Sequence, residues 1–451
     1  MEHYSLLDLV FGPLYLILIL AMANIYAKKK VLVNSEYKYF VKGLIAKLIG
    51  GIGLAFVYTF YYPGGDTLQY FYDSLAFQKL MFVDFDSFTY VFFRKADITN
   101  FLYFNSETGF PAYCRDPKAW FVVKCCVFIV GIGMHSYLAT TIIFATLSFF
   151  GIWKLYLVFV NEFPSLKKEL AVSFLFIPSV FFWGSGLLKD TFTFSALGYI
   201  VWCLYNFLVL RKDILKSIVI LILAVTVILS IKPYILVGLL PAVIIWIIKS
   251  FMKKIKGAVL KTAAVPILII FGFGFGYLFM IMLGEALQEY KLDSILDKAV
   301  VNQRDLKSDY HKGNAFDIGE FDASVGSVLS KFPIATFSAI FRPLIIETNN
   351  LVMFISGIEN LLILIFTIRV LIKVKVFGLF RYVFKNELLA FSFVFAILFA
   401  FSVGLSTSNF GSLVRYKIPC MPFFVASLYI ISYLKDKSEN LGFSNEERKL
   451  E

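Results

Sequence analysis

Long apolar runs alternate with short polar loops along most of the chain. A helix that crosses a bilayer needs about 20 mostly apolar residues, and eleven runs approach or exceed that length. The predicted spans are 5–27, 39–61, 137–160, 170–186, 188–210, 216–231, 233–250, 263–284, 351–372, 387–405 and 418–434. We therefore expect an all-α, polytopic membrane helix bundle that forms one membrane domain over residues 1–451.

The basic residues of the short loops predict the orientation of this bundle. Lysine and arginine clusters follow the first, fifth, seventh and ninth runs and precede the fourth. Such clusters favour the cytoplasmic side, and eleven spans place all of them there. We expect a multi-pass protein of the cytoplasmic (inner) membrane, with its N-terminus outside and residues 435–451 as a cytoplasmic tail. The long loops 61–118 and 285–350 then face outward.

Two apolar segments do not fit the span pattern. Residues 119–134 (AWFVVKCCVFIVGIGM) are too short for an untilted crossing and contain Lys124. We interpret them as an interfacial or re-entrant helix, because a full crossing would put the basic loops on opposite sides. The alternative is a true span with a misassigned partner elsewhere. Residues 332–347 are amphipathic and are expected to lie along the outer membrane surface.

Composition supports a membrane protein and narrows the chemistry. Hydrophobic residues make up 59% of the chain and charged residues 16%, against about a quarter in soluble domains. The net charge of +12 comes largely from the short loops, so it does not indicate nucleic-acid binding. The five cysteines form no CxxC pair, which indicates neither a disulfide framework nor a zinc site. The first run lacks a basic leader, and we expect a retained span instead of a signal peptide.

Asp66 is the candidate catalytic residue. It follows the Pro63-Gly64-Gly65 turn in YYPGGDTLQYFYDS, where the second span leaves the membrane. A carboxylate at this boundary suits a general base that takes a proton from a sugar hydroxyl. The alternative is a turn aspartate that caps a helix beginning at Thr67.

Two outer hairpin tips add charged residues. WGSGLLKDTF (183–192) presents Lys189 and Asp190, and SIKPY presents Lys232. Lys189 is a candidate phosphate ligand, and Asp190 a candidate to orient a sugar or Lys189. The alternatives are a plain hairpin tip for the first pair and a snorkelling interface lysine for Lys232.

The last two outer segments carry arginines against the positive-inside trend. FRPLIIE (341–347) contains Arg342 and Glu347, and SNFGSLVRYKIP (408–419) contains Arg415 and Tyr416. The guanidinium fork pairs with phosphate oxygens in bidentate fashion. Lys189, Arg342 and Arg415 at one membrane depth would suit a lipid phosphate or diphosphate. The alternative is pairing with acidic loop residues.

Weaker signals are kept as hypotheses. Asp84 and Asp86 form a DxD pattern that suits a divalent metal, although such short patterns often arise by chance, and Asp73 is a more remote candidate. No cofactor is firmly predicted beyond this metal option. FGFGFG (271–276) lies within an apolar run, where close helix packing explains its glycines. Glu359 lies inside the ninth run and is either functional or paired with a neighbouring lysine or amide.

These residues together resemble the GT-C membrane glycosyltransferases, which take sugars from polyprenyl-phosphate carriers. The likeness consists of Asp66 in a long outer loop, Asp190 at an outer hairpin tip, and Arg415, Tyr416 and Pro419 in RYKIP before the last span. Unlike the family pattern, the acidic loop follows the second span, which an additional N-terminal helix would explain. More distantly, GDTLQYF is similar to a D-x-x-x-Y stretch of some O-antigen and exopolysaccharide polymerases.

Both resemblances imply transfer of a sugar from a polyprenyl-phosphate carrier to an acceptor hydroxyl on a glycan, lipid or protein, in cell-surface glycan assembly. Asp66 would deprotonate the acceptor, and Lys189, Arg342 and Arg415 would stabilise the leaving phosphate. A lipid or solute transporter, or flippase, is the alternative of another class, and it predicts interrupted helices in paired halves. A structural or assembly role is the remaining alternative.

Overall fold

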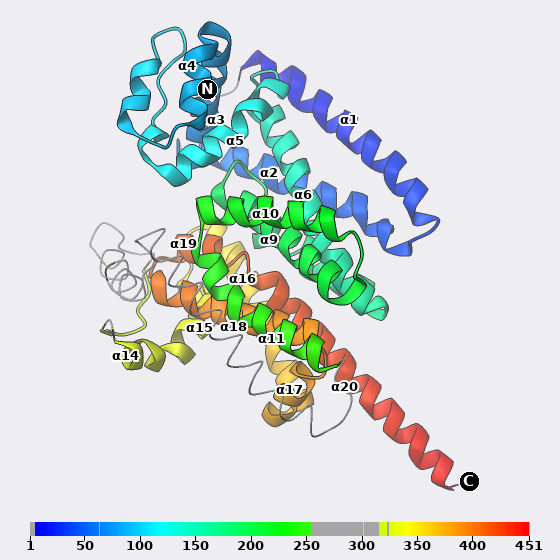
Figure 1. The fold of residues 1–451 in the computed structure, drawn as a ribbon. Coiled ribbons are helices and arrows are strands. Elements are labelled where there is room, and N and C mark those ends of the chain that lie inside the picture. The colour runs from blue at the N-terminus through cyan, green and yellow to red at the C-terminus, as the bar shows by residue number, and fades with distance from the viewer. Residues whose placement is uncertain (1–4, 63, 254–300, 302–314, 323, 451) are drawn as a thin grey trace. The chain divides into compact units, whose positions relative to one another are not determined.

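The computed structural model describes residues 5–62, 64–253, 301, 315–322 and 324–450, and within them the chain is helical without β-strands (Figure 1). Eight helices in these residues are long and apolar enough to cross a membrane. They are α1 (Leu6–Val31), α2 (Phe40–Phe56) with its flanking turns, α6 (Tyr137–Glu162), α9 (Lys189–Tyr205) with the turn after it, α10 (Ile214–Ile231), α11 (Tyr234–Met252), α16 (Leu351–Val374) and α18 (Glu387–Ser406). The expected all-α polytopic membrane bundle is confirmed.

The predicted number of eleven spans is not confirmed. Predicted span 170–186 is divided between α7 (Lys167–Leu175) and α8 (Pro178–Trp183), because Pro178 disfavours helical geometry in the residue before it. The last predicted span, 418–434, falls in the turn before α20 (Met421–Leu450) and in α20 itself. Helix α20 and the preceding α19 (Phe410–Tyr416) are bent by 63° and count as a ninth span if taken together. Predicted span 263–284, with FGFGFG, lies outside the described residues, as does most of loop 285–350.

The remaining elements are short. The helices are α3 (Asp66–Val83), α4 (Phe85–Phe93), α5 (Pro117–Ile132), α14 (Val325–Ser330), α15 (Phe332–Phe341) and α17 (Val376–Val383). Single-turn segments are η1 (Ser35–Tyr39), η2 (Val57–Tyr61), η3 (Ile98–Tyr103), η4 (Tyr113–Arg115), η5 (Pro164–Leu166), η6 (Asn206–Leu210) and η8 (Ile345–Glu347). Predicted surface segment 332–347 thus contains α15 and η8, and its position on the membrane stays a prediction.

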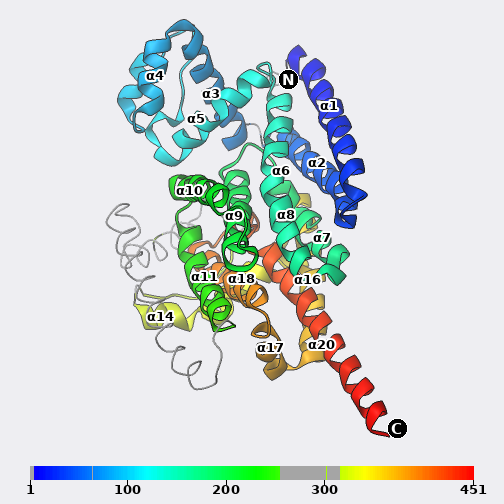
Figure 2. The ribbon, with the colours of Figure 1, turned by 45° about the vertical axis from the view of Figure 1, so that its right-hand side comes forward.

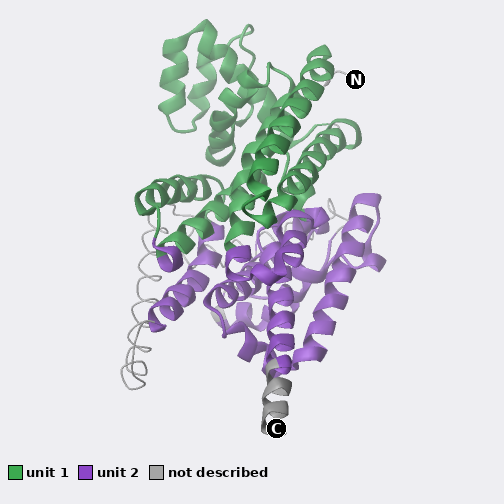
Figure 3. Ribbon diagram, turned by 90° about the vertical axis from the view of Figure 1, so that its right-hand side faces the viewer, with its two compact units in different colours: residues 1–158, 180–207, 212–233 green, residues 159–179, 208–211, 234–451 purple. Residues whose placement is uncertain are grey.

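The chain divides into two compact units, coloured separately in Figure 3. Unit 1 contains residues 1–158, 180–207 and 212–233, and unit 2 contains residues 159–179, 208–211 and 234–451.

Glycines bring the helices of unit 1 close together. A Cβ atom added at Gly198 of α9 would lie 2.2 Å from the backbone oxygen of Gly151 in α6. One added at Gly151 would lie 2.2 Å from the backbone oxygen of Ser195. Helices in membranes associate through such small residues, because lipid offers no hydrophobic drive for their association. The α6–α9 contact therefore requires glycine on both helices.

The first long loop folds into its own helical layer within unit 1. Helices α3, α4 and α5 lie side by side in Figures 1 and 2. The ring of Phe77 in α3 stacks on Trp120 in α5 with 5.1 Å between centroids, and both side chains are buried. Helix α5 is shorter than the candidate spans, and its expected interfacial or re-entrant position stays a prediction.

Unit 2 packs α15 and α11 against α18, and α20 against α18 and α16. Its core is aromatic, with Phe395 and Phe423 in edge-to-face contact at 5.0 Å between centroids. Gly404 of α18 meets the backbone of α15, where an added Cβ would lie 1.9 Å from the oxygen of Ala335. These contacts fix the segment after α15, which carries Arg342.

Candidate functional site

Asp66 is the first residue of α3, and it follows a turn that needs glycine. Gly64 and Gly65 have φ values of 106° and 114°, a region that favours glycine. The Asp66 carboxylate accepts a hydrogen bond of 3.0 Å from the hydroxyl of Tyr113. The helix begins one residue earlier than the capping alternative assumed, and its cap is Gly65. Pro63 of the predicted turn lies outside the described residues.

Asp73 explains why Tyr113 reaches Asp66. Its buried carboxylate accepts bonds from the backbone N–H groups of Ala112 (3.0 Å) and Tyr113 (2.7 Å), and from Gln69 (2.6 Å). Burial raises the pKa of Asp73, although these three bonds oppose the rise. Asp73 thus ties the segment before α5 to α3 and sets Tyr113 over Asp66. From the sequence alone, Asp73 was only a weak candidate for binding a metal.

Lys189 reaches the same segment from another helix. Its ammonium donates to Asp116 at 3.0 Å, and Asp116 also caps α5 by accepting from the N–H of Lys118 at 2.8 Å. Burial alone would raise the pKa of Asp116, but the bond and charge of Lys189 outweigh it and lower that pKa. Burial, with Asp66 next to the ring, raises the pKa of Tyr113.

Asp190 pairs with Lys232, and not with Lys189 as the sequence suggested. Both side chains are buried, and the Lys232 ammonium donates directly to the Asp190 carboxylate. Lys232 therefore does not extend outward as a snorkelling lysine would. Burying an ion pair of this kind costs desolvation energy. The pair is therefore weak evidence for stability, and it makes this position a candidate for a functional site.

These groups lie at one end of unit 1. Asp8, near the start of α1, accepts from Ser136 (2.7 Å) and from the N–H of Leu138 (2.8 Å) at the start of α6. Tyr137 donates to Thr67 of α3 at 2.8 Å. Five helix ends therefore meet, namely the starts of α1, α3, α6 and α9 and the end of α10. The sequence predicted that these ends lie on the same side of the membrane. The side of the membrane on which this end lies stays a prediction.

Four carboxylates (Asp66, Asp73, Asp116 and Asp190) and two lysines (Lys189 and Lys232) form this cluster, and each lysine is paired with one of the carboxylates. Two more basic residues, Arg115 and Lys118, flank Asp116 in the sequence. A carboxylate such as that of Asp66 suits a group that accepts a proton from a hydroxyl.

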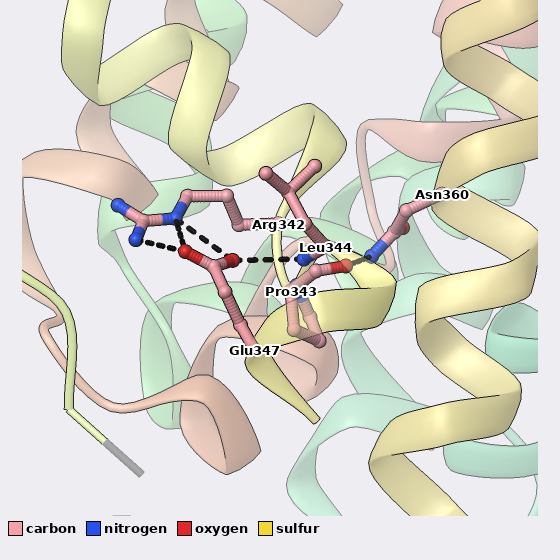
Figure 4. Close-up of polar contacts among 5 residues, drawn as sticks. All are labelled: Arg342, Pro343, Leu344, Glu347 and Asn360. Atoms are coloured by element: carbon pink, nitrogen blue, oxygen red, sulfur yellow. Dashed lines mark hydrogen bonds and ion pairs between the residues drawn. The ribbon is translucent and has the colours of Figure 1, made fainter. Parts of the chain in front are cut away.

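Unit 2 contains Arg342 and Glu347, which bind each other (Figure 4). The Arg342 Nε donates to both Glu347 oxygens, at 2.9 and 3.1 Å, and Glu347 also accepts from the N–H of Leu344 at 2.8 Å. Burial opposes ionisation of Glu347, but the bonds from Arg342 and Leu344 lower its pKa overall. The guanidinium also lies 5.0 Å from the ring centroid of Phe316. Pairing of Arg342 with an acidic residue, the open alternative, is therefore present.

Lys417 holds the segment that carries Arg342. Its side chain has no solvent exposure and donates to Asn360 Oδ1 (2.6 Å) and to the carbonyls of Ile340 and Arg342 (both 3.2 Å). Asn360 in turn donates to the carbonyl of Pro343 at 3.0 Å, as Figure 4 shows. Sequence reasoning placed no role on Lys417, although a lysine between two apolar runs signals a buried partner.

The remaining candidates differ in their surroundings. Glu359 accepts from the N–H (2.7 Å) and hydroxyl (2.5 Å) of Ser179, so its direct partner is neither a lysine nor Asn360. Arg415 and Tyr416 end α19 and are half-buried. Asp84 caps α4 by accepting from Ser87 at 3.0 Å, and Asp86 is exposed. No group of three or more His, Cys, Asp or Glu in the described part of the chain is placed to hold a metal.

The candidates thus fall into two sets, Asp66, Lys189, Asp190 and Lys232 in unit 1 and Arg342, Glu347, Arg415 and Tyr416 in unit 2. Joint action of the two sets stays a prediction. Comparison of the chain with protein-family models, curated proteins and solved structures finds no match.

Proposed function

We propose that this multi-pass membrane protein is a glycosyltransferase of the GT-C type, which moves a sugar from a polyprenyl-phosphate carrier to an acceptor hydroxyl. The observation that carries the proposal is the contact between Asp66 and Tyr113 at 3.0 Å, at the end of unit 1 where Lys189 and Lys232 also lie. An aspartate held at a helix start by a hydrogen bond suits a general base.

The proposed step is an inverting displacement. The acceptor oxygen attacks the anomeric carbon, the bond from that carbon to the phosphate oxygen breaks, and the acceptor proton moves to Asp66. Tyr113 orients the carboxylate through its hydrogen bond. The phosphate leaves with its bonding electrons, and its growing charge is stabilised by cations in a low-dielectric site.

Within unit 1, Lys189 is the cation that we assign to the phosphate, and it would have to exchange its bond to Asp116 for one to phosphate. Phosphate binding by Arg342 and Arg415 of unit 2 stays a separate prediction from the sequence. Arg342 offers a fixed guanidinium, because Glu347 holds one edge of it and Phe316 lies against it.

Two alternatives remain. An O-antigen or exopolysaccharide polymerase would use the same transfer with a growing glycan as acceptor. A transporter or flippase is favoured by one observation, the interrupted helices α7–α8 and α19–α20, because broken helices often line transport sites. The buried charges Glu359 and Lys417 fit that alternative as well.

Mass spectrometry of lipid-linked and surface glycans, with and without the gene product, separates these functions. A transferase predicts a surface glycan that lacks one sugar and accumulation of the loaded carrier lipid. A polymerase predicts single repeat units instead of chains. A flippase predicts that the carrier lipid accumulates on the cytoplasmic leaflet, and an unchanged glycan profile would contradict all three.

A further inference from the structure

Helix α17 of unit 2 presents an exposed aromatic face. Phe377 is 92% exposed, Val376 60% and Phe380 56%, and Phe384 at the end of the helix is also exposed. At 3.6 residues per turn these four side chains fall within an arc of about 100°. Exposed aromatic residues clustered on one arc mark an interaction surface, whereas scattered ones would not.

The opposite side of α17 is fixed to the bundle. Tyr382, which helical spacing places opposite the arc, is buried, and its hydroxyl bonds to that of Ser438 in α20 at 2.8 Å. Lys373, just before α17, pairs with Asp436 of α20 at 2.6 Å. The helix therefore has a defined rotation, and its aromatic face is directed away from unit 2.

Basic residues border the aromatic face. Lys375, Arg381 and Lys385 are all exposed, and helical spacing places Arg381 about 40° beyond Phe377 at the edge of the arc. Lys385 follows the helix, and its ammonium lies 4.4 Å from the ring centroid of Tyr382. The apolar surface also continues into span α16, where Ile372 is 75% exposed. An aromatic face with a cationic border, at the end of a membrane span, matches a helix that lies in the bilayer interface.

We propose that α17 is an interfacial helix that binds anionic phospholipid, with its phenylalanines among the acyl chains and Arg381 and Lys385 on the headgroups. Anionic headgroups attract basic residues next to a span, whereas zwitterionic headgroups offer no net charge. The basic loops predict that this end is cytoplasmic. The inference is independent of the proposed transferase activity, since it uses none of the residues assigned to that site.

The test uses the full-length protein in nanodiscs of phosphatidylglycerol or phosphatidylcholine, with lipid retention measured by native mass spectrometry. Neutralising two charges in Arg381→Gln/Lys385→Gln is expected to weaken phosphatidylglycerol retention by roughly 25-fold, because each charge near an anionic surface contributes roughly fivefold and the two factors multiply. Retention of phosphatidylcholine is expected to stay unchanged. Arg381→Lys/Lys385→Arg keeps the charge and should retain the lipid.

The matched control is Lys79→Gln/Lys95→Gln, which removes two exposed lysines from unit 1. Equal loss in the control would overturn the assignment to α17, because the effect would then follow net charge alone. A second measurement, Phe377→Trp with brominated lipids, reports insertion directly. Quenching by brominated lipids beyond that of the five native tryptophans would support insertion of this face into the bilayer. Absence of additional quenching in Phe377→Trp would contradict insertion and favour a protein partner for this face.

Discussion

The hydroxyl of Tyr113 donates a hydrogen bond of 3.0 Å to the carboxylate of Asp66, although 47 positions separate the two residues. The contact depends on Asp73, which binds the backbone of Ala112 and Tyr113 and thereby holds the tyrosine over α3. Two aspartates about two turns apart on α3 thus have different roles, since Asp73 positions the loop and Asp66 faces the proposed acceptor.

Tyr113→Phe removes this donor and little else. A hydrogen bond to a charged group contributes about 1.5–3 kcal/mol, so we expect the transfer rate to fall by about tenfold or more while the protein still folds. The measurement is product formation per folded protein, compared with Tyr103→Phe in the same loop. Wild-type rates in Tyr113→Phe would remove Tyr113 from the proposed mechanism.

Asp73→Ala is expected to lower stability by about 2–4 kcal/mol, because two backbone N–H groups and Gln69 lose their buried acceptor. Asp97→Ala is the matched control, since Asp97 also accepts a backbone bond, from Thr99 at 2.7 Å, but is exposed. The loss of stability in Asp97→Ala should stay near 1 kcal/mol, as for the removal of a helix cap. Thermal unfolding in detergent compares them, and equal losses would count against Asp73 as the anchor.

Gly198→Ala is expected to destabilise unit 1 by about 1–3 kcal/mol, because the new Cβ would lie 2.2 Å from the backbone oxygen of Gly151, and backbone cannot move aside as a flexible side chain can. Gly326→Ala is the control, because nothing lies within 4 Å of its added Cβ. Thermal unfolding is again the measurement. A neutral Gly198→Ala would mean that α6 and α9 are less close than described.

The pair of Asp116 and Lys189 predicts a stability change in acid. The pKa of Asp116 is lowered in the fold, so its ionised form stabilises the protein above the ordinary value of 3.8. That contribution, below about 1 kcal/mol for a half-exposed pair, is lost as the pH falls through the folded-state pKa. Asp116→Asn should therefore lower the unfolding temperature at pH 7 and much less near pH 3. An equal difference at both pH values would contradict the pairing.

Much of the fold follows from local pattern. Eight of the predicted spans coincide with long apolar helices. A run of about 20 apolar residues is long enough to cross a bilayer as a helix, and few other structures can accommodate it. The sequence did not predict the break before Pro178, since apolar composition continues through it. Hydropathy measures burial in lipid and carries little information on where a helix bends.

The site was predicted less completely than the spans. Asp66, Lys189, Asp190 and Lys232 were identified from position, but their partners were not. Asp190 was expected near Lys189, its neighbour in sequence, yet consecutive helical residues point about 100° apart, and Lys232 from α10 fills the place. Asp73 and Lys417 were missed as anchors because their partners are backbone groups brought near by tertiary packing.

The role of Asp66 as the base is tested most directly by restoring a deletion strain with Asp66→Asn and measuring surface glycans and carrier lipids by mass spectrometry. Glu107→Gln, an equally conservative change at an exposed position of the same loop, is the control. With equal amounts of each variant in the membrane, we expect Glu107→Gln to restore the wild-type glycan and Asp66→Asn to leave the loaded carrier lipid unused. Full restoration by Asp66→Asn would contradict the proposal.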